Sequence, residues 1–175
     1  LGVVASDTGG VGTARYAIAA CEYGEDKGIF GFGSSQSQTA GTTIYNLVSN
    51  AGVVASDNAG VGTVKTFHAA CSFGAPPKDQ GIFGYGRSGA TEYSITNLVS
   101  NTGVMQSDTA GVGTARYSLS STQYGGDRAM FGFGYASSLT ANVSTTNKVS
   151  NAGVVAADTS TVATARSGVS GCSFN

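Results

Sequence analysis

The sequence repeats itself with a period of about fifty residues, and this period constrains the fold more than any other feature. The segment that reads GVGTARY in its first copy recurs in related form at residues 10–16, 60–66, 111–117 and 161–167. The repeats span residues 1–50, 51–101, 102–151 and, incompletely, 152–175. Recurrence at such a period is typical of architectures in which each unit packs against the next one.

The composition favours a β-rich chain with many short strands. Charged residues make up 11% of the sequence, hydrophobic residues make up 41%, and 27 glycines interrupt the apolar segments. A disordered chain would carry more charge and fewer apolar residues. The net charge of −1 gives no electrostatic reason to expect nucleic acid as a partner, and no apolar run is long enough for insertion into a membrane.

Each of the three complete repeats contains four segments that read as strands. In the first copy these are residues 2–6, 12–21, 27–33 and 42–49. The segment at 12–21 is rich in alanine and has some helix propensity, but its short length between glycines favours an innermost strand. At 27–33 the alternation predicts that Gly28, Phe30 and Phe32 face one way and that the intervening residues face the other way.

The order of these segments resembles the kelch repeat of β-propellers. An arginine followed by small residues precedes a strand that ends in an aromatic residue between two glycines, as in Gly31-Phe32-Gly33. The same pattern recurs as Gly84-Tyr85-Gly86 and Gly132-Phe133-Gly134. Two departures are that an aromatic residue splits the kelch glycine pair and that tryptophan is absent. The segments DKGIFGFG, NLVSNAGVVASD and GVGTARY look like the divergent kelch-like repeats of tail and surface proteins of marine bacteriophages.

This resemblance implies an all-β fold in which residues 1–175 form a single β-propeller segment. It implies four-stranded antiparallel blades, with about three and a half repeats of a partial ring present. Because three full blades cannot close a ring, we expect the 175 residues to belong to a longer chain of six to eight blades. An intact mass near 17.4 kDa for the native polypeptide would contradict this expectation.

An acidic residue and a basic residue recur in every repeat, eight positions apart. We predict that each aspartate caps the turn before the inner strand and pairs with the cation that follows it. Because every repeat carries the pair, it indicates packing rather than one binding site. The residues are Asp7 and Arg15, Asp57 and Lys65, Asp108 and Arg116, and Asp158 and Arg166.

The remaining reactive residue types do not form a catalytic or metal-binding pattern. Cys21, Cys71 and Cys172 share one register, and their odd number argues for buried free thiols rather than a disulfide framework. His68 is the single histidine and occupies an otherwise apolar position, so we expect it to be packed. The stretch 84–89 matches GxGxxG formally, but a polar loop follows it instead of a helix. We therefore expect no catalytic residue, no metal and no cofactor.

The loop between the third and fourth expected segments differs most among the copies, and we assign candidate binding residues there. Variable loops on a repeated scaffold suit recognition, although surface loops also vary when nothing constrains them. Their polar content suits a glycan or the polar surface of another protein. The candidates are Gln36, Gln38, Arg87, Glu92, Tyr93, Tyr135 and Asn142.

Three functions remain in competition. The first is a non-enzymatic structural or adhesion propeller of a virus particle, such as a phage tail or surface protein. Its partners would be other virion proteins, the remaining blades of its own chain, and a host surface glycan or protein. The second is a cellular or secreted lectin-like propeller, which would repeat one pocket in every blade. The third, an enzyme resembling the copper radical oxidases, would need clustered tyrosine, cysteine and histidine ligands that the sequence does not offer.

Overall fold

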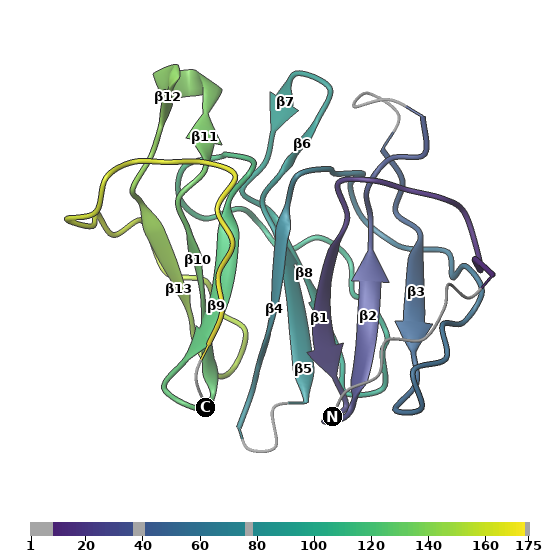
Figure 1. Cartoon of the computed structure of the whole chain (residues 1–175). Coiled ribbons are helices and arrows are strands. Elements are labelled where there is room, and N and C mark those ends of the chain that lie inside the picture. Colours follow the sequence, from purple (N-terminus) through teal and green to yellow (C-terminus); the bar gives the residue numbers. More distant parts are fainter. Residues whose placement is uncertain (1–8, 37–40, 76–78, 174–175) are drawn as a thin grey trace, which may run out of the picture.

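The computed structural model describes residues 9–36, 41–75 and 79–173, and over these residues the protein is all-β (Figure 1). Within them the only helical element is a 3-10 turn at Ser137–Leu139, labelled η1. Three antiparallel sheets of three strands follow one another along the chain, and no sheet in the described part closes on itself. They consist of β1 (Ala19–Tyr23), β2 (Lys27–Gly31) and β3 (Tyr45–Val48); β4 (Ala69–Phe73), β5 (Gln80–Gly84) and β8 (Thr96–Val99); and β9 (Ser120–Tyr124), β10 (Arg128–Gly132) and β13 (Thr146–Val149).

The three sheets share one register, as the sequence repeat requires. Phe83 lies opposite Ala70 on one side and Asn97 on the other, and Phe30 and Phe131 have equivalent partners in their own sheets. The middle strand is therefore the aromatic-glycine segment in every sheet. Duplication of the sequence has duplicated the hydrogen-bond ladder.

A fourth segment follows the third strand of each sheet but is joined to it only by isolated bridges. In the first sheet Val54 bridges Val48, Asn58 bridges Tyr45, and the Ala55 N–H donates to the Leu47 carbonyl at 2.8 Å. The second and third sheets repeat these bridges. This fourth segment corresponds to the first expected segment of the next repeat (residues 52–56 for the first sheet), and it has a less regular form than a strand.

Consecutive sheets stack face to face through a contact between an aromatic ring and a glycine. A Cβ atom on Gly31 would lie 3.0 Å from the Phe83 ring, and one on Gly84 would lie 2.7 Å from the Phe131 ring. Any side chain at these glycines would displace the ring of the next sheet, so the glycines permit close stacking. Phe83 and Phe131 are fully buried in two hydrophobic clusters, one between each pair of sheets.

The first strands of the three sheets, β1, β4 and β9, lie side by side in the middle of the molecule (Figure 1). Their sequences contain alanine, serine and cysteine, and these small side chains allow neighbouring strands to approach. The Ser121 hydroxyl donates to the Ala70 carbonyl across two of them at 2.6 Å. The prediction that this segment is a strand rather than a helix is confirmed for its last part only, because β1 begins at Ala19.

The predicted alternation along residues 27–33 is wrong beyond Gly31. Strand β2 ends there, and Phe32 takes a left-handed backbone conformation with φ of 56°. Tyr85 and Phe133 do the same at φ of 64° and 63°. This turn sends the ring of Phe32 into the core, where it is fully buried, whereas Phe30 is 37% exposed. The two phenylalanines therefore do not share a face.

Candidate functional site at the loop end

Two short hairpins stand at the same end of the second and third sheets, at the top of Figure 1. One is formed by β6 (Arg87–Ser88) and β7 (Thr91–Glu92), and the other by β11 (Tyr135–Ala136) and β12 (Ala141–Asn142). The Glu92 carboxylate joins them, because it accepts hydrogen bonds from the Ser137 N–H at 3.0 Å and from the Ser137 hydroxyl at 2.6 Å. The variable loops of the second and third sheets thus form one connected surface.

A stack of aromatic rings around an arginine underlies these hairpins. The Arg87 guanidinium lies 4.1 Å from the centre of the Tyr117 ring and 5.1 Å from that of Phe67. Tyr117 in turn contacts the Tyr135 ring, with ring centres 5.6 Å apart. All four side chains are half-buried. A guanidinium on an aromatic face is a favourable cation–π arrangement, so this stack is a preformed platform rather than a set of independent side chains.

The structure brings some of the predicted loop residues together and separates others. Arg87, Glu92 and Tyr135 belong to the connected surface, and Asn142 is exposed on its outer strand. Tyr93 is half-buried, and its N–H donates to the Gly86 carbonyl. Gln36 is exposed in the first repeat, and Gln38 lies outside the described residues. Phe67 and Tyr117 were not among the candidates, because each lies just before an inner strand rather than in a variable loop.

The repeated acidic and basic residues form a hydrogen-bond network that crosses the repeat boundary. Asp108 accepts from the Thr63 N–H at 2.9 Å, the Thr63 hydroxyl at 2.7 Å and the Asn97 side-chain amide at 2.9 Å. The Asn97 carbonyl oxygen accepts from the buried Lys65 ammonium at 2.5 Å. Asp57 and Asp158 make the same contacts in the first and third sheets. The network ties the segment before the first strand to the last segments of the same sheet.

The predicted pairing of each aspartate with the cation eight residues later is therefore wrong in its register. Arg116 forms its ion pair with Asp158 at 4.0 Å, and Arg15 and Lys65 likewise interact with the aspartate of the next repeat. The reason is that each aspartate ends the fourth segment of one sheet, whereas the cation that follows it begins the next sheet. Asp7 lies outside the described residues, and Arg166 lies over the Phe133 ring at 5.2 Å.

An asparagine that the sequence reasoning missed connects every one of these networks. Asn46, Asn97 and Asn147 each donate to an aspartate and accept from a cation, and all three are buried. Hydrogen bonds from Asn46 and then Thr13 hold the pKa of Asp57 below its usual value. For Asp158, burial acts to raise the pKa, but hydrogen bonds from Thr114 and Asn147 outweigh it and the pKa is lowered. The sequence signal for this role was an asparagine at the same position of the third strand in each of the three complete repeats.

His68 is packed in the core, as its apolar register predicted. Its ring lies 5.3 Å from the centre of the Phe32 ring and 5.8 Å from that of Phe83. Burial, and then the nearby Lys65, lower the pKa of His68 to about 3, against a smaller opposing effect of the Gly31 backbone. Burial also lowers the pKa of Lys65 to about 8. The imidazole is therefore neutral at pH 7 and packs among aromatic rings in the core.

We expect this histidine to make folding stability fall as the solution becomes mildly acidic. The unfolded chain binds a proton at His68 below about pH 6.5, whereas the folded chain resists protonation until about pH 3. Stability is therefore complete above about pH 6.5 and is lost by up to about 1.4 kcal/mol per pH unit below it. Urea denaturation between pH 7 and pH 5 measures this slope. His68→Leu, which copies Leu119 of the third repeat, should flatten it; an equal slope in that variant would contradict the assignment.

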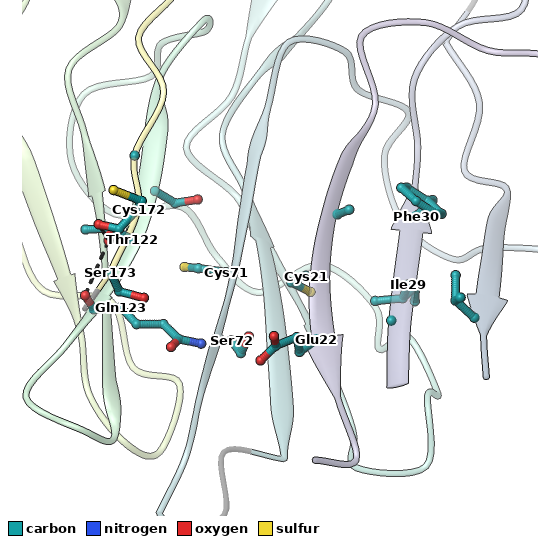
Figure 2. A pocket seen from close by; sticks show the side chains of 15 residues that line it. Cys21, Glu22, Ile29, Phe30, Cys71, Ser72, Thr122, Gln123, Cys172 and Ser173 are labelled. Carbon is teal, nitrogen blue, oxygen red and sulfur yellow. Dashed lines mark hydrogen bonds between the residues drawn. The ribbon is translucent and has the colours of Figure 1, made fainter. Parts of the chain in front are cut away.

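A hollow of about 490 Å³ is lined by residues of β1, β2, β4 and β9 and by residues 171–173 (Figure 2). Cys21, Cys71 and Thr122 lie on the neighbouring strands β1, β4 and β9, and Cys172 lies beside Thr122, in the order that their shared register predicted. Burial raises the pKa of the Cys71 thiol to about 12 and raises that of Cys21 as well. Because the thiolate is the reactive form, these two thiols act as small packing groups. All three cysteines are free.

Comparisons with known proteins add no family to this description. No protein-family model matches the chain, and no curated protein is significantly similar to it. Over the described residues, no group of three or more histidine, cysteine, aspartate or glutamate side chains is placed to hold a metal ion. In the same residues we find no helix with the length and apolar character needed to span a membrane.

Proposed function

We propose that this chain is part of a non-enzymatic β-propeller that attaches to a neutral polar ligand, such as a glycan, through the loop end of its sheets. In this proposal the sheets are blades, and the hairpins β6–β7 and β11–β12 form the attachment surface. The single observation that carries the proposal is the Glu92–Ser137 link. It joins the variable loops of neighbouring sheets into one surface above the Arg87 stack.

The order of the segments supports the blade interpretation. Each sheet runs antiparallel from an innermost first strand to an outer fourth segment, and the first strands of successive sheets lie side by side. The link between the first and second strands lies at the same end of the sheet as the link that follows the third strand. In the first sheet Asn50 donates to Asp26 across these links at 2.9 Å, and in the third sheet Asn151 donates to Asp127 at 3.1 Å. The links between the second and third strands of the sheets, which are the most variable loops, therefore lie together at the opposite end, as in an up-and-down blade.

The chemistry of the loop end favours a sugar-like ligand. Half-exposed aromatic rings can stack on the apolar face of a sugar ring, and carboxamide and hydroxyl groups can bond its hydroxyls. Ser138, Thr140 and Asn142 are exposed beside Tyr135. The Arg87 guanidinium is partly covered by the Tyr117 and Phe67 rings, and the Glu92 carboxylate is hydrogen-bonded to Ser137. The surface therefore does not select strongly for a ligand of either charge.

The biological setting of the proposal is a virus particle, in which the propeller would serve as a tail or surface protein for host attachment. The resemblance of the repeat wording to phage kelch-like repeats supports this setting. The alternative is a cellular or secreted lectin-like propeller. A lectin-like propeller would repeat the Arg87 stack in each blade. The bridge that Arg87 makes with Thr66 is made by Ser34 in the first repeat and by Tyr135 in the third, so the arginine is not repeated. This asymmetry favours a single attachment surface.

We expect a glycan array to give selective binding that depends on the loop end. Tyr135→Ala and Asn142→Ala should each weaken the selected interaction by about ten-fold, because each removes about 1–2 kcal/mol of contact. Glu92→Ala should have a similar effect by releasing Ser137. The matched control is Glu25→Gln, which alters an exposed residue at the opposite end of the first sheet.

The outcome has two informative alternatives. If no glycan binds, but the chain binds a protein and the same loop variants lose that binding, the surface is an adhesion site for protein. If the loop variants bind as well as the control, or if they lower the melting temperature sharply, these residues are packing elements and the proposed surface is wrong.

A further inference from the structure

The second repeat places a buried amine next to a carboxamide. Lys65 Nζ donates to Asn97 Oδ1 at 2.5 Å, and both residues are fully buried. Because a C=O bond measures about 1.23 Å, the Asn97 Cγ atom lies within about 3.7 Å of Nζ. Reacting atoms in a near-attack arrangement lie about 3–3.5 Å apart. A small movement of the lysine side chain, from the edge of the carboxamide to its face, therefore brings the amine within reach of the carbonyl carbon.

An amine at this position distinguishes the second repeat from the other copies. In the first and third sheets an arginine occupies the equivalent place: Arg15 contacts Asn46, and Arg116 donates to Asn147 at 2.8 Å. A guanidinium stays protonated in proteins, so it has no lone pair with which to attack a carbonyl carbon. Because the arginines make the same hydrogen bond, the network does not require a lysine. Lys65 adds a nucleophile to a site that is otherwise repeated.

The surroundings of Lys65 favour its neutral form. The Lys65 Nζ atom lies over the Phe32 ring, 4.7 Å from its centre. Burial lowers the pKa of Lys65 to about 8, against the opposing attraction of Asp108. His68, the other titratable group near this amine, is neutral at pH 7. About one-tenth of the molecules therefore carry a neutral Lys65 amine at pH 7, and this fraction rises with pH.

Asp108 is placed to carry the protons that an attack on Asn97 requires. Its Oδ1 atom accepts from the Asn97 Nδ2 atom at 2.9 Å, and its other oxygen accepts from the Thr63 N–H and hydroxyl. Burial acts to raise the pKa of Asp108, but hydrogen bonds from Thr63 and Asn97 outweigh it and the pKa is lowered. The group is therefore a carboxylate at neutral pH. Asp108 is also exposed, so it can exchange protons with the solvent.

We propose that Lys65 and Asn97 form an intramolecular amide cross-link in the folded protein, with Asp108 as the proton carrier. The neutral Lys65 amine attacks Asn97 Cγ, a C–N bond forms, and the carbonyl π electrons move to Oδ1. Asp108 accepts a proton from Nζ and passes it to Nδ2, which is then bonded to the same carbon. The Cγ–Nδ2 bond breaks as the carbonyl forms again, and ammonia leaves. Nothing is oxidised or reduced, and no further reactant is needed.

The cross-link would join two segments of the second repeat that are distant in sequence. Lys65 precedes β4, and Asn97 lies on β8, 32 residues later. The bond therefore encloses β4, β5 and the β6–β7 hairpin in one covalent loop, which restricts the unfolded chain as a disulfide does. This site is separate from the loop end and does not depend on the ligand proposed there.

Intact mass spectrometry of the folded protein tests the proposal. We expect a mass below that of the 175-residue sequence by one ammonia, about 17 Da. Trypsin should then release one branched peptide in which Lys65 is uncleaved and joined to Asn97. For chain recovered unfolded in guanidinium chloride and refolded between pH 6 and pH 9, the rate of linkage should rise about ten-fold per pH unit below about pH 8 and level off above it, because the neutral amine attacks.

Lys65→Arg is the matched control, because it copies Arg116 and keeps a donor to Asn97. It should fold, as circular dichroism checks, and should show no loss of ammonia. Asp108→Asn should slow the linkage at least ten-fold; an unchanged rate in this variant would overturn the role of the carboxylate. Loss of ammonia that persists in Lys65→Arg, or that occurs without the branched peptide, would indicate a cyclised asparagine and overturn the cross-link. The full sequence mass in the folded chain at every pH would also overturn it.

Discussion

Phe83→Ala is expected to lower the free energy of unfolding by about 3–5 kcal/mol, the range for removing a buried aromatic side chain. Phe83 is fully buried, lies on Gly31 of the first sheet, and packs against Phe32 with ring centres 5.6 Å apart. Its removal would open a cavity between two sheets that no neighbouring side chain can fill without moving a strand. Urea denaturation monitored by circular dichroism measures the loss.

The matched control for this prediction is Phe30→Ala at the same position of the first sheet. From the sequence we expect the two substitutions to cost the same, because the residues are identical in register. The structure corrects this, because Phe30 is 37% exposed and has no preceding sheet among the described residues. We now expect a loss of about 1 kcal/mol or less. Equal losses at Phe30 and Phe83 would contradict the stacking of the sheets.

Asp158→Ala is expected to lower the free energy of unfolding by about 2–3 kcal/mol. The substitution removes the acceptor for the Thr114 N–H, the Thr114 hydroxyl and the Asn147 amide, and it takes the counter-charge from Arg116. Arg116 is fully buried, and its remaining acceptors are neutral oxygens of Phe133, Thr114 and Asn147. We place the loss below that of a fully buried ion pair because the Asp158 side chain is 30% exposed and partly screened by water.

Asp57→Ala provides the comparison, because Asp57 makes the same hydrogen bonds in the first sheet. Its cation, Arg15, is only half-buried and can be solvated when the carboxylate is lost. Thermal unfolding should therefore show a smaller decrease for Asp57→Ala than for Asp158→Ala. A larger decrease at Asp57 would show that the hydrogen bonds dominate and that the burial of the cation has little effect.

The sequence predicted the features of the fold that depend on local repetition. The period, the antiparallel strands and the strand conformation of the small-residue segment follow from residue types at fixed spacing. The candidate loop residues were predicted from the variation among the copies, and Arg87, Glu92, Tyr135 and Asn142 do lie on the two hairpins of the second and third sheets. These predictions hold because equivalent residues make equivalent contacts in each copy of the repeat.

Features that depend on contacts between repeats could not be read from one copy. The eight-residue spacing of aspartate and cation concealed that each pair is split between two sheets. The left-handed turn at Phe32 was missed because an alternating strand pattern and a turn with an aromatic residue between glycines read alike. The Arg87 stack was missed for a similar reason, because Phe67 and Tyr117 come from two different repeats.

The most direct test of the account is whether the Phe131 ring lies on Gly84, since this contact defines the stacking of the second and third sheets. A nuclear Overhauser spectrum of the protein, with Phe131 assigned through Phe131→Leu, measures the proximity of the ring protons to the Gly84 α-protons. We predict a strong cross-peak there and a second one between Phe83 and Gly31. Absence of both cross-peaks in a folded sample would contradict the stacked arrangement of the repeats.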